Sequence, residues 1–355
     1  MLKSFRYFLL PLAIIYGIII WIRNKLFDKN ILKSAEFNFP LICVGNLATG
    51  GTGKTPMTEY IVEHLKKNFT VATLSRGYKR RTKGFAIANE STTALDIGDE
   101  PMQFHLKFRD ITVAVGEERL IAIPQILHQR PETQIIVLDD AFQHRAVRAG
   151  FNIILTDYSN LYTRDLMFPA GDLRDVRESS KRADIIVVTK CKPEFSSDEK
   201  IKLIHELNPL PNQSVFFTAI EYGTPYHLFN HDLRKIENTD EVLLVCGIAN
   251  PKPIKDYLNQ QVRFYEMIKY PDHHIFSYDD LLYIKKQFKK IQSSNKMILI
   301  TEKDAVRMDK FKSELADFPI YVLPVKHCFL FNQGDEFNQL IEKYIYVYSF
   351  EKKKN

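Results

Sequence analysis

Apolar and polar positions divide most of the chain into short apolar runs and longer amphipathic segments. The apolar runs lie at residues 41–44, 71–76, 112–115, 134–138, 151–158 and 183–190. Such runs are typical of strands that are buried on both faces of a parallel sheet. The segments that start at residues 56, 102 and 117 carry apolar residues at helical spacing. This alternation of strands with helices predicts an α/β fold.

The pattern changes near residue 195. A helix-like stretch at 196–208 and a proline-rich turn precede strand candidates at 214–220, 241–248 and 296–304. An amphipathic helix ends the chain at 334–350. We therefore expect a first domain with a mostly parallel sheet at residues 31–210 and a second, smaller α/β domain at residues 211–355. The C-terminal helix is expected to dock back on the first domain.

Residues 1–30 contain the most apolar segment of the chain. Its uncharged core, residues 7–22, is shorter than the usual spanning length of about 20 residues and contains Pro11. Cations flank the core on both sides, and no small-residue cleavage site follows it, which argues against a cleaved signal peptide. We expect a membrane-associating helix that lies in or dips into the interface, anchored by Trp21 and the cations. A true span and a helix packed on the protein's own core are the alternatives.

A glycine-rich segment joins the first apolar run to the first helical segment. It reads ATGGTGKT at residues 48–55, which is a phosphate-binding loop with Ala48 in place of the usual first glycine. Backbone N–H groups of such a loop face one anion, Lys54 can reach the β- and γ-phosphates, and Thr55 can ligate Mg²⁺. The alternative is a glycine-rich turn without a ligand. The predicted nucleotide-binding residues are Ala48, Thr49, Gly50, Gly51, Thr52, Gly53, Lys54 and Thr55.

Charged residues follow several of the predicted strands, at the edge where open α/β sheets bind ligands. Asp139 and Asp140 end one apolar run, as a Mg²⁺-holding strand end does in P-loop enzymes. Arg76 follows another strand and opens a cationic turn, where it either meets an anionic ligand or is solvated. Arg174 and Asp175 form a candidate functional pair in an arginine-rich loop, and both could equally be solvated.

Composition adds little to this picture. Of the 355 residues, 45% are hydrophobic and 26% are charged, which is ordinary for a folded chain of one or two domains. The formal net charge of +6 suits an anionic substrate or membrane surface, although solvated lysines explain it equally well. The four cysteines do not have zinc-binding spacing.

Together, the motifs resemble those of the tetraacyldisaccharide 4′-kinase family, the lipid A 4′-kinases, over essentially the whole chain. They are the apolar N-terminal helix, VGNL…GGTGKTP, SRGY, GDEP, LDDAFQH, PAGDLRD, ADIIVV, PDHH and ITEKDAV. GGTGKT alone marks a very large class of proteins, whereas VGNL, DDAFQ and PDHH are much more specific. The resemblance implies a two-domain P-loop fold with the active site in the cleft.

The resemblance also implies the reaction. The γ-phosphoryl group of ATP, with Mg²⁺, passes to the 4′-hydroxyl of a tetraacyldisaccharide 1-phosphate and gives the lipid A precursor lipid IVA. The implied partners are the lipid disaccharide and the cytoplasmic surface of the bacterial inner membrane, without nucleic acid, and we expect a monomer. The alternative is a P-loop nucleotide-driven switch or metallochaperone, which would hydrolyse nucleotide without lipid.

Residue by residue, the resemblance assigns a role to each matching position. The expected metal-side residues are Thr55, Asp139, Asp140, Gln143 and Asp175. The expected catalytic residues are Lys54, Arg174 and Asp99, the last acting as a base with His273 or His274. Asn46 and Arg76 are expected to bind the substrate. For Asp99, the alternative is that it caps the helix that starts near Pro101.

Three positions depart from the common family pattern. Ala141 stands where glycine is usual, and Tyr270 stands where phenylalanine is frequent. Asp175 stands where glutamate usually follows the arginine, so its carboxylate is one methylene closer to the backbone.

Overall fold

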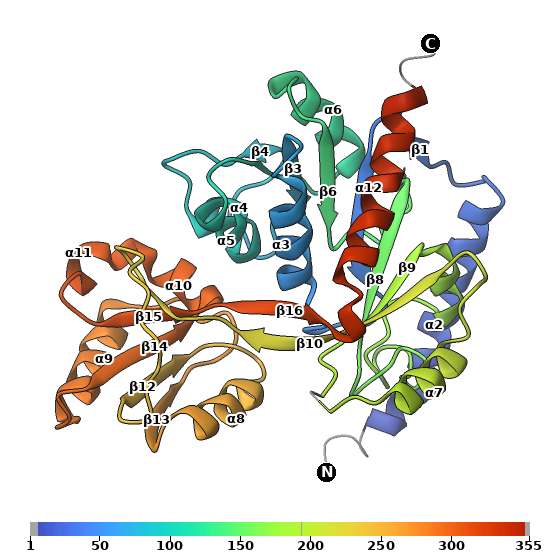
Figure 1. The fold of residues 1–355 in the computed structure, drawn as a ribbon. Coiled ribbons are helices and arrows are strands. Elements are labelled where there is room, and N and C mark those ends of the chain that lie inside the picture. The colour runs from blue at the N-terminus through green and yellow to red at the C-terminus, as the bar shows by residue number, and fades with distance from the viewer. Residues whose placement is uncertain (1–5, 193, 352–355) are drawn as a thin grey trace.

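The computed structural model describes residues 6–192 and 194–351. A larger and a smaller unit lie side by side, and two paired strands, β10 (Ser214–Tyr222) and β16 (Val325–Phe329), run between them (Figure 1). Both units are α/β, and the larger one contains a mostly parallel sheet, so the predicted fold class is confirmed.

The large sheet has nine strands in the order β16-β10-β9-β8-β2-β6-β3-β5-β4. The strands not yet named are β2 (Leu41–Asn46), β3 (Val71–Ser75), β4 (Ala86–Ile87), β5 (Thr112–Val115), β6 (Ile135–Asp139), β8 (Phe151–Asp157) and β9 (Ile185–Thr189). Pairing is parallel from β10 to β5, whereas the edge strands β4 and β16 are antiparallel. The central strands are buried along their whole length, in agreement with their continuous apolar sequences.

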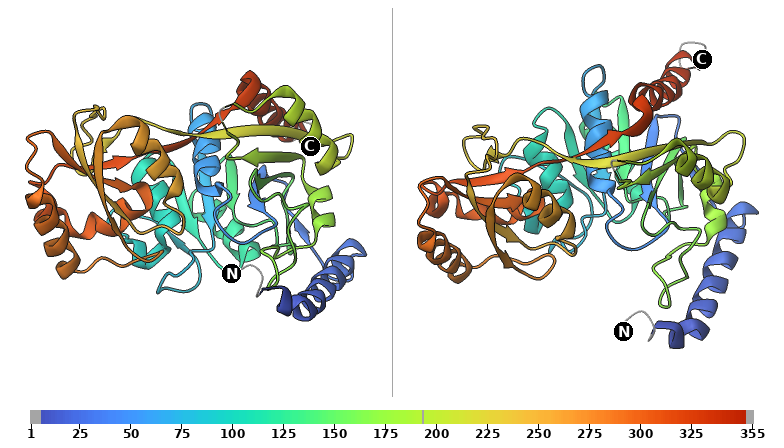
Figure 2. Two further views of the ribbon diagram at one scale, coloured as in Figure 1. Left: turned by 90° about the horizontal axis from the view of Figure 1, so that it is seen from below. Right: turned by 60° about the horizontal axis from the view of Figure 1, so that its bottom comes forward.

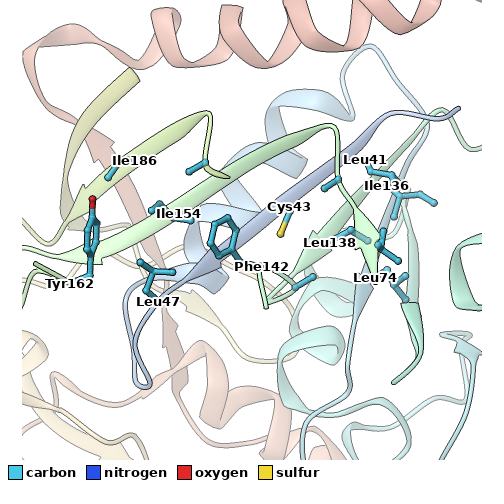
Figure 3. Close-up of a cluster of buried hydrophobic side chains, with 14 of the residues drawn as sticks. Leu41, Cys43, Leu47, Leu74, Ile136, Leu138, Phe142, Ile154, Tyr162 and Ile186 are labelled. Carbon is cyan, nitrogen blue, oxygen red and sulfur yellow. The ribbon is translucent and has the colours of Figure 1, made fainter. Parts of the chain in front are cut away.

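Helices cover both faces of this sheet. On one face, α3 (Lys54–Leu65) and the C-terminal helix α12 (Gly334–Glu351) pack against a cluster that includes Ile42 and Val44. On the other face, α6 (Arg119–Gln129) and α7 (Ser197–Leu207) pack on a second cluster, which includes Leu41 and Cys43 and is drawn in Figure 3. Neighbouring residues of β2 thus point to opposite faces, as in any strand.

Further elements complete the larger unit. They are η1 (Tyr7–Leu9), α2 (Leu10–Asp28), β1 (Ala35–Glu36), α4 (Ala94–Ile97), α5 (Asp99–Lys107), β7 (Val147–Arg148), η2 (Arg177–Arg182) and η4 (Leu330–Asn332). β1 pairs with β7, and α5 packs beside β5.

The smaller unit is a five-stranded sheet covered by helices. Its strands, in the order β11-β15-β14-β12-β13, are β11 (Tyr226–His227), β12 (Glu241–Cys246), β13 (Phe264–Lys269), β14 (Lys296–Thr301) and β15 (Ile320–Leu323). Its helices are α8 (Lys252–Gln261), α9 (Tyr278–Lys290), α10 (Glu302–Met308), η3 (Asp309–Phe311) and α11 (Lys312–Leu315). α8 packs on one face, and α9 and α10 pack on the other.

The expected boundary at residues 210 and 211 falls just before β10. β10 pairs with β9 of the large sheet, and β16 pairs with β10, so the chain leaves this sheet after Tyr222 and returns to it at Val325. The smaller sheet therefore lies between these two strands in the sequence. Helix α12 packs on the larger unit, although it follows the smaller one in the chain.

The N-terminal helix α2 stands at the edge of the larger unit (Figure 2). Pro11 lies in its first turn, where proline does not interrupt a helical hydrogen bond. Many apolar side chains of η1 and α2 are exposed, namely Tyr7, Phe8, Leu12, Ile14, Ile15, Ile18, Ile19, Trp21 and Ile22. In the described part of the chain, Tyr7–Asp28 is the helix that is long and apolar enough to cross a membrane, and only 11% of its apolar window is buried. The helix is therefore not packed into the protein's own core.

Tyr344 provides a test of how α12 is fastened to the sheet. Its hydroxyl accepts the N–H of Leu41 at 3.1 Å and donates to the Leu41 carbonyl at 3.2 Å. Tyr344→Phe should lower the free energy of unfolding by about 1–2 kcal/mol in urea titrations, because both buried groups lose a partner. Tyr346→Phe on the exposed side of the same helix is the control and should change it by less than about 0.5 kcal/mol. Equal losses in the two variants would contradict this account of α12.

Candidate active site

The phosphate loop lies between the end of β2 and the start of α3, in the order that the sequence predicts. Gly50 has a φ of 100°, and Gly53, the residue before α3, has a φ of 86°. These left-handed backbone angles favour glycine. They place Lys54 and Thr55 in the first turn of the helix, where backbone N–H groups have no intrahelical acceptor. The helix N-terminus is therefore suited to an anion.

The loop is braced by hydrogen bonds at both ends. The N–H of Thr49 donates to the carbonyl of Asp172 at 2.7 Å, and the amide of Asn46 donates to the hydroxyl of Thr52 at 2.9 Å. Ala48 is not among the residues with positive φ, so its position does not require glycine. The departure from the usual loop pattern is thus compatible with the observed backbone.

Four of the predicted residues meet beside the loop. The ammonium of Lys54 lies 3.8 Å from Asp140, whose carboxylate also accepts both terminal nitrogens of Arg174. Arg174 further donates to the side-chain oxygen of Asn46 at 2.7 Å. Burial raises the pKa of Asp140, but the charges of Lys54 and Arg174 outweigh it, and the pKa lies below its usual value. Asp140 is therefore an ionised group that holds two cations next to the phosphate loop.

Asp139 is the neighbouring carboxylate, and it is only 3% exposed at the end of β6. It accepts the hydroxyls of Thr58 and Ser75, each at 3.3 Å. Burial, together with the negative charges of Glu100 and Asp140, raises the pKa of Asp139 to about 7. Three carboxylates are thus concentrated at this edge of the sheet.

This concentration of negative charge suits a divalent cation. Mg²⁺ commonly takes one or two protein carboxylates, while water and phosphate oxygens fill its other positions. The hydroxyl of Thr55 lies 3.5 Å from Glu100 and adds an oxygen donor beside the carboxylates. Among residues 6–192 and 194–351, no group of three or more His, Cys, Asp or Glu side chains has the arrangement of a metal cage.

The contacts of Asp175 differ from those expected of a metal ligand. It is 1% exposed, and its carboxylate accepts Asn24 of α2 and Ser179, each at 2.8 Å, and Arg182 at 3.3 Å. These donors enclose the carboxylate, so its contacts do not support the predicted metal role. Asp175 instead ties the arginine-rich loop to the N-terminal helix.

Asp99 meets the PDHH motif across the two units. It is the first residue of α5, and Gly98 is the N-cap, so the alternative of a capping role for Asp99 is wrong. Its carboxylate lies 3.0 Å from Nδ1 of His273 and 2.8 Å from Arg307, both of which belong to the smaller unit. Burial raises the pKa of Asp99, but the hydrogen bond of His273 and the charge of Arg307 bring it below its usual value.

His274 has a different set of partners. Its Nε2 lies 3.0 Å from Asp280, and its ring stacks on Tyr270 with centroids 4.4 Å apart. Of the two histidines, His273 is the one that contacts Asp99. Tyr270, which replaces a frequent phenylalanine, still supplies the aromatic ring for this stack.

The remaining predicted residues lie around the loop. Gln143 donates its amide to the main-chain carbonyl of Asn46 at 2.7 Å. Arg76 follows β3 and is exposed. Burial and the charges of Arg119 and Arg76 lower the pKa of His144 to about 4.

The sequence reasoning assigned no role to three residues of the site, Glu100, Lys303 and Arg307. Lys303 pairs with Glu100 at 2.9 Å, and Arg307 pairs with Asp99. All three lie in or beside motifs that carry the family resemblance, GDEP and ITEKDAV, but their residue types gave no sign that these motifs would meet.

The fold and the site define a class of protein. A parallel sheet, a glycine-rich loop before a helix and an acidic strand end are features of P-loop enzymes that bind nucleoside triphosphates. A family model described as tetraacyldisaccharide-1-P 4′-kinase matches residues 5–346. The chain belongs to the tetraacyldisaccharide 4′-kinase family.

Individual relatives agree over almost the full length. The tetraacyldisaccharide 4′-kinase of Bacteroides thetaiotaomicron is 42% identical over 352 residues, covering 95% of this chain and 92% of that protein. The Flavobacterium johnsoniae enzyme is 44% identical over 343 residues, with coverages of 96% and 97%. A crystal structure of LpxK from Aquifex aeolicus in complex with ATP has a TM-score of 0.76 and 26% identity, and covers 97% of this chain and 100% of that chain. The predicted family, ATP-dependent kinase activity and place in lipid A biosynthesis are therefore confirmed.

Lys54 allows a direct test of the phosphate loop. Lys54→Ala should lower kcat at least about 10²-fold, because it removes a charge aimed at the transferred phosphoryl group. Lys67→Ala, an exposed lysine just beyond the same helix, is the control and should leave kcat unchanged. Near-normal phosphoryl transfer by Lys54→Ala would refute the assignment of this loop.

Proposed function

We propose that the chain binds ATP with Mg²⁺ on residues 48–55 and transfers the γ-phosphoryl group to the 4′-hydroxyl of a tetraacyldisaccharide 1-phosphate. The product is the lipid A precursor lipid IVA. The observation that carries this proposal is the contact of Asp99 with His273, which puts a carboxylate–imidazole pair next to the nucleotide side. The adjacent residue, Glu100, lies within 3.5 Å of the Thr55 hydroxyl.

Phosphoryl transfer requires mainly positioning and charge stabilisation from the protein. The N–H groups at the start of α3 and the ammonium of Lys54 bind the β- and γ-phosphates. Thr55, Asp139 and Asp140 would hold Mg²⁺. When bound, the metal neutralises charge on the bridging phosphate oxygens. Arg174, which is oriented by Asp140 and Asn46, stabilises the charge of the transferred group.

Asp99 accepts the proton of the acceptor hydroxyl in this proposal. Its lowered pKa makes it a weak base, but a loose phosphoryl-transfer transition state requires a positioned carboxylate more than a strong one. His273 and Arg307 fix the carboxylate by contacts of 3.0 and 2.8 Å. We assign them to the orientation of Asp99.

We further propose that the protein works as a monomer on the cytoplasmic surface of the inner membrane. The exposed apolar side of α2 would lie in the interface, with Trp21 and the flanking cations as anchors. The opposite side of α2 bonds to the loop of Arg174, since the Tyr16 hydroxyl donates to the Arg174 carbonyl at 3.1 Å. A single chain supplies every group that the proposed reaction needs.

The direct experiment is an assay of phosphoryl transfer from ATP to the disaccharide 1-phosphate lipid in detergent, with Mg²⁺ supplied or chelated. We expect the 1,4′-bisphosphate, with the new phosphate at the 4′-position, only when both lipid and Mg²⁺ are present. ATP hydrolysis at the same rate without lipid would contradict the proposed reaction and favour a nucleotide-driven switch.

The proposed base gives a second prediction. Asp99→Asn and His273→Ala should each lower kcat by about 10²-fold or more with little change in ATP affinity. Because the two side chains act together, the double variant should be little worse than the worse single one. His274→Ala is the matched control, since its partner is Asp280, and it should retain most of the activity. A fully active Asp99→Asn enzyme would remove Asp99 from the mechanism.

The helix gives a third prediction, in which only exposed side chains are changed. Replacing Ile14, Ile18 and Trp21 by Gln should release the protein from membranes, because about 2 kcal/mol of burial is lost for each apolar side chain. The contacts of α2 with the Arg174 loop are kept in this variant. Activity should therefore fall more with lipid in bilayers than with lipid dispersed in detergent.

The control for this variant replaces exposed apolar residues away from α2. Ile201→Gln and Leu233→Gln should leave membrane sedimentation unchanged, since both side chains are exposed elsewhere on the protein. If the α2 variant still sediments with membranes, another surface provides the main attachment.

A further inference from the structure

His327 contacts the phosphate loop from a strand that the sequence reasoning left without a role. It lies on β16, opposite Ile220 of β10, and only 5% of its surface is exposed. Its Nε2 is 2.9 Å from the carbonyl oxygen of Gly53, and its Nδ1 is 2.9 Å from the hydroxyl of Thr218. The ring therefore bridges the strand pair and the residue that begins α3.

The partners determine the state of this ring. A carbonyl oxygen only accepts hydrogen bonds, so Nε2 carries the proton that it donates to Gly53. Nδ1 is then the acceptor for the Thr218 hydroxyl. Burial lowers the pKa of His327 to about 4, so the imidazole is neutral near pH 7 and this arrangement is stable.

The hydrogen bond to the Gly53 carbonyl orients the peptide between Gly53 and Lys54, which faces the proposed nucleotide site. In a trans peptide, the C=O of Gly53 and the N–H of Lys54 point in opposite directions. The donor on the carbonyl therefore also sets the direction of the Lys54 N–H, which opens the helix N-terminus. The carbonyl accepts the N–H of Met57 at 3.1 Å as well, so His327 occupies its second acceptor position.

Two further observations show how closely this contact is built. A Cβ atom on Gly53 would lie 3.0 Å from both Cε1 and Nε2 of His327, so the ring leaves little room for a side chain at this position. Thr189, at the end of β9, donates to the carbonyl of the preceding residue, Thr52, at 2.8 Å. The peptides on both sides of Gly53 are thus held from outside the loop.

We infer that His327 is a positioning residue for phosphoryl transfer, which holds the phosphate loop to the strand that returns from the smaller unit. The smaller unit also carries His273 and Arg307, which contact Asp99. The strand β16 therefore connects the phosphate loop to the unit that orients the base. The inference deepens the proposed reaction and rests on the phosphate-loop assignment.

Two substitutions separate positioning from mere filling of space. In His327→Gln, the amide nitrogen reaches about as far as Nε2 and can still donate to Gly53. In His327→Asn, the shorter amide reaches about as far as Nδ1, so it can meet Thr218 but not Gly53. Both variants place one amide in the same buried site, and Lys326→Ala on the exposed side of β16 is the surface control.

We expect kcat/KM for ATP to fall about tenfold in His327→Asn and to stay within about threefold of the parent value in His327→Gln, because one hydrogen bond is lost in the first and kept in the second. Thermal midpoints of the two variants should be similar. Equal activity of the two variants, at whatever level, would overturn the inference. Lys54→Ala and the His327 variants test different claims. Lys54→Ala tests whether nucleotide binds at this loop, whereas the two His327 variants test whether the hydrogen bond to Gly53 positions the loop.

A spectroscopic measurement on the unaltered protein does not depend on whether the variants fold. With ¹⁵N-labelled histidine, His327 should show a neutral ring protonated at Nε2 from pH 5 to pH 8. A non-hydrolysable ATP analogue with Mg²⁺ should shift this Nε2–H resonance, because the Lys54 N–H of the same peptide faces the bound phosphates. A ring protonated at Nδ1, or a resonance that the analogue does not move, would contradict the inference.

Discussion

A balance of buried charge at the carboxyl edge of the large sheet determines the arrangement of the site. Burial and the nearby charges of Glu100 and Asp140 raise the pKa of Asp139 there to about 7. Lys54 from α3 and Lys303 from the smaller unit oppose this charge. Because an uncompensated buried charge is costly, these elements are held in one arrangement.

Further ion pairs connect the two units. Arg307 binds Asp99 while it also contacts Asp304 at 3.2 Å, and Lys107 bridges Glu59 of α3 at 2.7 Å and Glu302 of α10 at 2.8 Å. The helix that begins with the phosphate loop is therefore linked to the smaller unit through charged groups near its middle as well as through β16. Reaction geometry and the relative placement of the units depend on one set of ion pairs.

The sequence could predict what depends on local pattern. Continuous apolar runs indicated the parallel strands, and the glycine spacing located the turn at Gly53. It could not decide between His273 and His274, because the choice depends on where the chain turns around His273, which has a φ of 61°. The metal role expected for Asp175 came from a motif position, whereas the side chain is enclosed by donors from α2 and its own loop. The contact of Asp175 with Asn24 joins residues 151 positions apart and leaves no trace in local spacing.

The two sides of the N-terminal helix have different contacts. Its exposed apolar side chains are not covered by the rest of the protein. On its other side, Tyr16 donates to the backbone carbonyl of Arg174, and Asn24 donates to the carboxylate of Asp175. The side chain of Arg174 in turn binds the Asp140 carboxylate beside the phosphate loop. A helix seated at the membrane surface would therefore hold the loop that faces the phosphates at a fixed depth. In the proposed reaction, a lipid whose acyl chains remain in the bilayer would then present its hydroxyl to the nucleotide at this depth.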